Sequence, residues 1–250
     1  MKIVVCVKQV PDTEAKIRIG SDGKTIETSD VNFILNPYDE FAVEEALQIK
    51  EREGDGEITI LCLGPERATS AIRTALAMGA DNGVHIKVDD AYLDSFAVST
   101  ALSNVLKEME FDLLLMGKQA VDDDNCQIGP RVATLLDIPC VSVVTKLEMS
   151  DGAVVAEREV EGGVEVIEAK LPAIVTSQKG LNEPRYASLK GIMMAKKKPI
   201  EEKSVDVPEA KISTNKMEYP PAREAGKIVG EGVEAVPELV RLLHEEAKVI

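Results

Sequence analysis

Aromatic residues are scarce in this 250-residue chain, which has no Trp, four Tyr and four Phe. A stacking site for a flavin or a nucleic-acid base has few candidates among them. The two histidines, His85 and His244, are isolated, so we predict a structural or surface role for both. No G-x-G-x-x-G follows a strand, and the motifs G-x-S-x-G and H-E-x-x-H are missing. Without a paired nucleophile and base, a hydrolase or transferase mechanism has little support.

Cysteines are few and far apart. The four are Cys6, Cys62, Cys126 and Cys140. They form no C-x-x-C pair, which argues against a metal site or a disulfide framework. We therefore predict mainly buried thiols in a reducing compartment.

Positive charge and long apolar runs are limited as well. The net charge is −15 and the one dense basic cluster is Lys196–Lys198, which argues against nucleic-acid binding. Apolar runs such as Leu113–Met116 are too short to span a bilayer, and Met1 leads straight into a strand-like segment. We expect a cytoplasmic protein with no transmembrane segment.

Short β-rich runs alternate with segments of helical periodicity over the first ~145 residues. The predicted strands cover Ile3–Val7, Glu57–Leu63, Gly83–Val88 and Phe111–Met116. Asn36-Pro37 predicts the start of a helix, with Asn36 as the N-cap. This alternation predicts an α/β fold: a mostly parallel, Rossmann-like sheet with helices on both faces.

The pattern changes at about Ser142 to consecutive hairpins, which predict an antiparallel extension of the sheet edge. A polar segment follows, with a short helix at about Leu189–Ala195, and then a Pro-interrupted arm ends in an apolar helix. An arm of this composition cannot readily bury itself. We divide the chain into a nucleotide-binding domain, 1–199, which includes the extension and a docking loop, and a C-terminal arm, 200–250, which packs on a partner subunit.

The most informative segment is GKQAVDDDNCQIG, Gly117–Gly129, between a predicted central strand and a helix. Open α/β sheets bind ligands at this kind of position. A glycine at the strand exit lets a ligand approach the backbone, polar side chains can bind an adenine or ribose, and helix N-terminal amides suit a phosphate. Three consecutive aspartates would repel a phosphate if all pointed inward. An acidic solvated loop therefore stays open as the alternative.

Two further segments have both an ordinary and a functional interpretation. Asn36–Asp39 can offer helix amides to the same ligand, or can be a simple Asn-Pro helix start. Lys196–Lys198 can be a solvated charge run, or, beside Met193 and Met194, a docking surface for an acidic partner.

Six stretches of the chain, in order, resemble the beta subunit of electron-transfer flavoproteins. They are VVCVKQVPD, NPYDEFAVEEALQIKE, TALAMGAD, GKQAVDDDNCQIG, AEREVEGGVEVIEAKLPAIVTS and LNEPRYASLKGIMMAKKK. The resemblance implies a fold similar to adenine nucleotide alpha hydrolases and a heterodimer with a larger alpha subunit. That partner would hold most of the redox FAD. Electrons would come from an acyl-CoA or related dehydrogenase, as in fatty acid β-oxidation, and leave to a quinone oxidoreductase.

The resemblance also implies site residues, with no catalytic residue and no metal. A structural AMP would be held by Cys6, Asn36, Pro37, Tyr38, Asp39, Leu63, Gly117, Lys118, Gln119, Ala120, Val121, Asp122, Asp123, Asp124, Asn125, Cys126, Gln127 and Ile128. Glu159 would meet the flavin domain, and Leu189 would anchor the dehydrogenase, flanked by Lys196, Lys197 and Lys198.

One departure from the family pattern leaves the ligand open. AMP-type members read D-D-D-x-N-Q-T-G-Q, whereas Gln127-Ile128-Gly129-Pro130 resembles the Q-V-G-P of electron-bifurcating members, which bind a second FAD here and oxidise NADH. Those members carry D-G-D, and Asp123 replaces that glycine. We expect AMP, with a second FAD as the alternative. A stand-alone ATP-binding stress-type protein or nucleotide-dependent enzyme is the alternative from another class.

Overall fold

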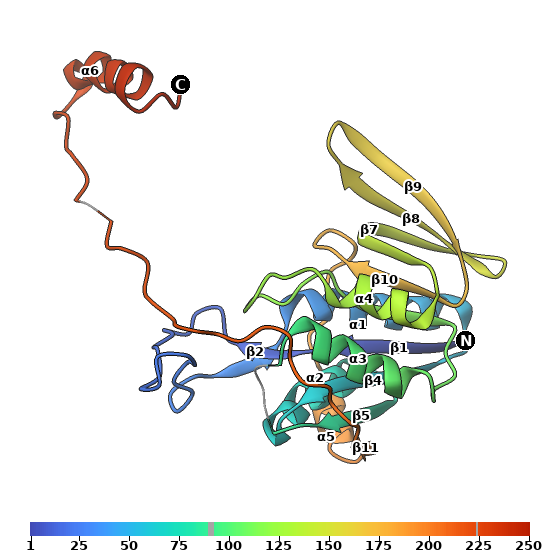
Figure 1. Ribbon diagram of the computed structural model, residues 1–250. Coiled ribbons are helices and arrows are strands. Elements are labelled where there is room, and N and C mark those ends of the chain that lie inside the picture. Colours follow the sequence, from blue (N-terminus) through green and yellow to red (C-terminus); the bar gives the residue numbers. More distant parts are fainter. Residues whose placement is uncertain (90–92, 224) are drawn as a thin grey trace. The chain divides into compact units, whose positions relative to one another are not determined.

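The computed structural model describes residues 1–89, 93–223 and 225–250, and the chain forms two compact units, 1–215 and 216–250 (Figure 1). The first unit is built on a sheet with the strand order β11-β5-β4-β1-β6-β10-β7-β8-β9. The bounds are β1 Lys2–Val7, β4 Glu57–Gly64, β5 Asn82–Lys87, β6 Leu113–Gly117, β7 Cys140–Ser150, β8 Ala153–Val160, β9 Gly163–Lys170, β10 Ala173–Ser177 and β11 Ile200–Lys203. From β11 to β7 every neighbouring pair is parallel, whereas β8 and β9 are antiparallel to their neighbours. The predicted α/β class and antiparallel edge are confirmed.

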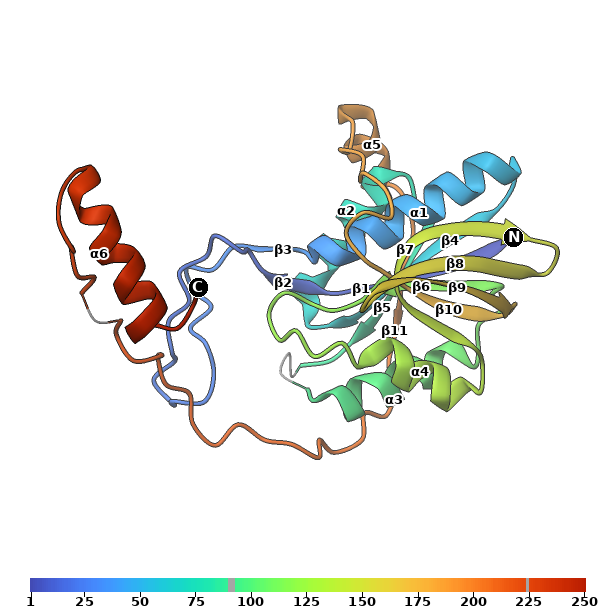
Figure 2. The same ribbon diagram turned by 90° about the horizontal axis from the view of Figure 1, so that it is seen from above.

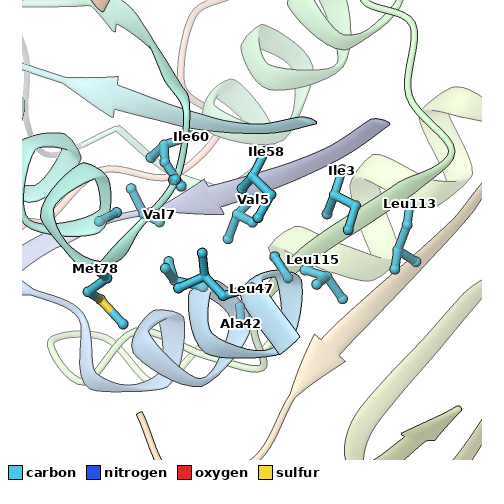
Figure 3. Packing of buried hydrophobic residues seen from close by; sticks show 14 of the residues in the cluster. Ile3, Val5, Val7, Ala42, Leu47, Ile58, Ile60, Met78, Leu113 and Leu115 are labelled. Atoms are coloured by element: carbon cyan, nitrogen blue, oxygen red, sulfur yellow. The ribbon is translucent and has the colours of Figure 1, made fainter. Parts of the chain in front are cut away.

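Helices cover both faces of the parallel part (Figure 2). They are α1 Pro37–Glu53, α2 Thr69–Met78, α3 Ser95–Leu106 and α4 Ile128–Leu136, whereas the short helix α5, Leu189–Ala195, packs on α2. Along β1 the side chains alternate: Ile3 and Val5 join the core with α1 and α2, whereas Val4 and Cys6 join the core with α3 and α4. Figure 3 shows Ala42 and Leu47 of α1 packed beneath these strands. A strand buried on both faces explains the continuous apolar runs in the sequence.

A small excursion interrupts the first crossover. β2, Gln9–Pro11, pairs antiparallel with β3, Phe33–Leu35. Between them the predicted Asp22-Gly23 turn is present, with Gly23 at φ +65° and an isolated antiparallel bridge between Ile19 and Ile26. Glycine takes this backbone conformation without steric cost.

Two strands of the sheet were not assigned from the sequence. β10 is a fully buried five-residue run that inserts between β6 and β7. β11, at Ile200–Lys203, is a polar edge strand that pairs with β5. A short polar run has no period-2 pattern to mark it, so β11 depends on the exposed edge of β5 for its partner.

The second unit contains the 3₁₀ turn Val233–Ala235 and α6, Val236–Arg241, which continues as a π-helical turn over Leu242–Glu246. The predicted terminal helix is therefore present. None of the helices in the described ranges has the length and apolarity needed to cross a membrane.

The cysteines and His85 mostly follow expectation. Cys6 and Cys62 are buried and Cys140 is half-buried, in line with the prediction of mainly buried thiols, whereas Cys126 is exposed. His85 is buried and its Nε2 lies 2.9 Å from the carbonyl oxygen of Gly64. This is the predicted structural role.

Candidate functional site

The strand order reverses direction between β1 and β6. The chain passes from β1 to β4 and β5 on one side, then returns to place β6 on the other side of β1. The carboxyl ends of β1 and β6, at Val7 and Gly117, therefore lie at a topological switch point. In open α/β sheets this is the position where ligands bind.

A buried carboxylate joins the two strand ends to α1. The Asp39 side chain accepts hydrogen bonds from the backbone N–H of Lys8 at 2.7 Å and of Gly117 at 2.9 Å. Asp39 is only 5% exposed. Burial raises its pKa to about 7, although the two backbone hydrogen bonds oppose that shift. Asp39 therefore fixes the first turn of α1 against the carboxyl edge of the sheet.

Asn36 occupies the N-cap position of α1 but does not cap it with its side chain. Its Nδ2 donates to the carbonyl oxygen of Gln119 at 2.9 Å, and its Oδ1 accepts from the N–H of Val121 at 3.2 Å. The predicted N-cap position is therefore confirmed, although the side chain does not cap the helix. The buried amide pairs with the 118–127 loop because that loop supplies both a donor and an acceptor within reach.

Gly117 is required by packing. A Cβ at this position would lie 2.5 Å from Asp39 Oδ1 and 2.6 Å from Tyr38 Cβ. Both distances are shorter than any real contact of this kind. The space beside the strand exit is filled by the start of α1, whereas the sequence suggested that it would be left for a ligand. The glycine lets α1 and β6 approach each other.

The three consecutive aspartates each have a partner. The Lys8 ammonium lies 2.8 Å from the Asp122 carboxylate and 3.3 Å from that of Asp123. Asp124 accepts from the Gln119 side-chain amide, and its own N–H donates to Ala120 at 2.9 Å. The Lys8 ammonium offsets one of the three negative charges, which lowers but does not remove the repulsion of a phosphate.

The loop then turns sharply into α4. Asp124 and Cys126 take left-handed backbone conformations, with φ of 50° and 54°. The Cys126 thiol lies 3.3 Å from the Gln119 Oε1. At the start of α4 no side chain caps the helix, and within the described chain no hydrogen bond engages the N–H groups of Ile128 and Gly129. Free amides at a helix N-terminus are donors for an anion.

The remaining predicted site residues lie on the same edge. The Lys118 ammonium is 5.3 Å from the centre of the Tyr38 ring. Cys6 and Leu63 are the last residues but one of β1 and β4, and neither bonds to the 118–127 loop in the described residues. Burial raises the pKa of the Cys6 thiol, which favours the protonated thiol over the thiolate. The structure thus brings Asn36, Asp39 and the loop into one network and leaves Cys6 and Leu63 beside it.

Sequence reasoning missed two groups at this edge. Lys8, which follows β1 directly, forms ion pairs with Asp122 and Asp123 of the acidic loop. Ser177, which ends β10 in register with Gly117, is fully buried, and its hydroxyl has no partner in the part of the chain described. The signal for Lys8 was its place immediately after a predicted strand. Ser177 could not be found because β10 itself was not assigned.

The predicted docking residues lie on other surfaces. Leu189 of α5 is 84% exposed and Met193 is 70% exposed. Lys196 and Lys197 are exposed, whereas the Lys198 ammonium donates to the carbonyl oxygens of Leu76 and Ala80 at the end of α2. Lys198 therefore fastens its own segment. Glu159 is exposed on β8, opposite Val164 of β9.

Comparisons with known proteins agree with this architecture. Residues 23–208 match the family model of the electron transfer flavoprotein domain. The chain is 48% identical to the electron transfer flavoprotein subunit beta of Bacillus subtilis, over the whole of both chains. It is 44% identical to that of Syntrophomonas wolfei, covering all of this chain and 98% of the relative, and 39% identical to that of Homo sapiens, covering all of this chain and 99% of the relative. The chain therefore belongs to the electron transfer flavoprotein family, among its beta subunits.

Proposed function

We propose that this chain pairs with a larger alpha subunit, holds a structural AMP at the β1–β6 edge, and supports a redox FAD held mainly by that partner. The observation that carries the proposal is a nucleotide-type edge whose polar groups bind and orient but form no acid–base pair. Asp39 has both oxygens engaged by backbone N–H groups, and Cys6 and His85 are buried. Such an edge suits a protein in which a cofactor supplies the chemistry.

The residues present fit an adenosine monophosphate. The N–H groups of Ile128 and Gly129 and the ammonium of Lys118 are available to an anion. Asn125 and Gln127 supply amide groups of the kind that bind an adenine or ribose, and both are exposed. AMP has no redox chemistry, so its role here would be to hold the 118–127 loop in place.

A second FAD at the same edge is the alternative, favoured by the Gln127-Ile128-Gly129-Pro130 sequence. Asp123 argues against it, because its carboxylate pairs with Lys8 across the loop where bifurcating members have a glycine. A side chain there would crowd an isoalloxazine ring. AMP is therefore the ligand that we propose.

The exposed apolar surfaces suit two different partners. On α5, Leu189, Ile192 and Met193 are exposed beside basic residues, which suits an acidic surface on an acyl-CoA or related dehydrogenase. On α6, Val236, Leu239 and Val240 are exposed, which suits packing of the arm on the alpha subunit. Electrons would pass from the dehydrogenase to the FAD and on to a quinone oxidoreductase, in the cytoplasm.

The test is to co-express the chain with the larger subunit, purify the complex, denature it and count the released FAD and AMP by chromatography. One FAD and one AMP per heterodimer support the proposal. Two FAD and no AMP support the bifurcating alternative, which adding NADH and following flavin reduction would check. A monomeric chain without flavin that turns over ATP would support the stand-alone alternative and overturn both.

A further inference from the structure

The segment that carries α5, residues 178–199, is called the docking segment here. It leaves the sheet after β10 and returns to it at β11. Between these points α5 packs on α2 (Figure 2). A Cβ on Gly191 would lie 2.4 Å from the carbonyl oxygen of Ala77, and Ala195 is 2% exposed. One side of α5 is thus in close contact with α2, while Leu189 and Met193 face outward.

Charged groups of α1 hold the amino-terminal half of the docking segment. The Arg185 guanidinium donates to both oxygens of Glu44, at 2.8 and 2.9 Å, and to both oxygens of Glu51, at 2.6 and 3.1 Å. The Arg185 backbone N–H also donates to Glu44 at 3.1 Å. Glu44 is only 3% exposed. A buried carboxylate that is paired twice by a planar guanidinium fixes the direction as well as the position of the chain.

A second set of contacts holds the carboxyl-terminal half. The Arg73 guanidinium of α2 donates to the carbonyl oxygens of Ala195 and Lys198 at 2.5 and 2.7 Å. In return, the Lys198 ammonium donates to the carbonyl oxygens of Leu76 and Ala80. These contacts tie the carboxyl end of α5 to α2. Together with the Arg185 contacts to α1, they hold the docking segment on both sides of α5.

We infer that Arg185, acting through Glu44 and Glu51, is a positioning residue for docking: it holds the docking segment so that Leu189 and Met193 are presented to the dehydrogenase in one orientation. This inference rests on the proposed function of that surface. Arg185 itself makes its contacts inward, to α1. Its effect on binding is therefore indirect.

A docking segment that is fixed in advance should bind its partner more tightly, because ordering a loop on binding costs conformational entropy. A docking segment that is free before binding must be fixed when the partner arrives, and that cost is subtracted from the affinity. Three exposed apolar side chains on a short helix offer little area to compensate. Fixing the segment in advance removes the cost and leaves the electron-transfer step itself unchanged.

The experiment uses the purified heterodimer and an acyl-CoA dehydrogenase reduced by its acyl-CoA. The rate of flavin reduction is followed while the heterodimer concentration is varied, which gives a KM for the heterodimer and a kcat. The variants are Arg185→Gln, Arg185→Lys, Leu189→Ala and the double variant with Arg185→Gln and Leu189→Ala. Lys2→Ala is the matched control, because it removes a positive charge and an ion pair, to Glu110 at 2.6 Å, without removing a contact to the docking segment in the described residues.

Arg185→Gln is expected to raise KM about five- to tenfold at unchanged kcat and flavin content, since several ordered side chains are released. Arg185→Lys keeps the positive charge but cannot bind both carboxylates in the bidentate way of a guanidinium, so a smaller rise in KM is expected. The double variant should raise KM by less than the product of the two single rises, because Arg185 acts partly through Leu189. Trypsin should also cut faster after the exposed Lys190, Lys196 and Lys197 in Arg185→Gln. Lys2→Ala should change none of these values.

An unchanged KM and cleavage rate in Arg185→Gln, alongside a raised KM in Leu189→Ala, would overturn the inference. Fully additive effects in the double variant would overturn it too. An unchanged KM in Leu189→Ala would instead overturn the docking part of the proposed function, so the two failures are distinguishable. If Arg185→Gln folds poorly, Glu51→Gln removes only the exposed half of the contact. It is expected to give a smaller rise in KM, and no rise would overturn the inference.

Discussion

Asp39 predicts an unusual dependence of stability on pH. Its carboxyl group is buried at the junction of β1, β6 and α1, and burial raises its pKa from 3.8 to about 7 in the folded protein. In the unfolded chain the group returns to its ordinary value. The folded state therefore holds a proton over a pH range in which the unfolded state has already lost it.

The sign follows from linkage. Stability rises with pH wherever the unfolded state binds more protons, and here the folded state binds more. The contribution of Asp39 is thus most favourable below its unfolded pKa and is lost as pH rises towards about 7. This pH dependence is opposite in sign to that of a salt-bridged aspartate, whose contribution to stability is lost as the pH falls.

The magnitude comes from the same shift. From pH 5 to about pH 7 the folded protein keeps the Asp39 proton, whereas the same carboxyl group is already ionised in the unfolded chain. Over these roughly two pH units the free energy of unfolding falls by about 1.4 kcal/mol per unit. Asp39 should therefore remove about 3 kcal/mol of unfolding free energy across this range. Asp39→Asn cannot titrate, so it should lack this part of the pH dependence.

Urea unfolding of wild type and Asp39→Asn at pH 5 and pH 8 measures the difference directly, because the other titrating groups are shared by both proteins. The wild type should lose about 3 kcal/mol more than the variant between the two conditions. Equal losses in the two proteins would refute the reasoning, since Asp39 would then be ionised throughout.

Three other predictions concern single side chains. Gly117→Ala should lower the free energy of unfolding by about 1–3 kcal/mol, because the new Cβ overlaps α1. Gly163→Ala is the control, because nothing lies within 4 Å of its new Cβ. Thermal unfolding compares the two variants, and equal midpoints would contradict the packing argument. Asn36→Ala should release the 118–127 loop and lower the free energy of unfolding by about 1–3 kcal/mol, because the backbone groups of Gln119 and Val121 lose their partners. Limited proteolysis within the loop tests this, and an unchanged cleavage pattern would count against the contact. Leu189→Ala should weaken electron transfer from the dehydrogenase at unchanged flavin content, and loss of flavin instead would mean that the anchor assignment is wrong.

The regular part of the fold was predictable because it depends on local periodicity. The central strand, predicted at Phe111–Met116 and observed at Leu113–Gly117, and the short helix at about Leu189–Ala195 follow from apolar pattern and composition. β11 did not follow, since a polar four-residue strand is stabilised by the edge that it joins. Tertiary context decides such elements.

The location of the site was predictable from the sequence, but the side-chain contacts that build it were not. The loop after β6 was identified from strand and helix order. However, Asn36 and Asp39 carry the signals of an ordinary helix start, and only the fold shows that their side chains bond to the loop and to two strand ends. The same holds for Arg185 and Glu44, which lie 141 residues apart in the sequence. No local pattern encodes such contacts.

The central claim is that this chain holds an AMP at the β1–β6 edge while the FAD belongs mainly to the partner. The most direct test is to count AMP and FAD released from wild-type heterodimer and from one carrying Gly117→Ala. The account predicts one of each in the wild type, and loss of AMP with retained FAD in the variant, because the new Cβ overlaps Asp39 and Tyr38 at that edge. A variant that loses FAD and keeps AMP, or a wild type with two FAD and no AMP, would contradict it.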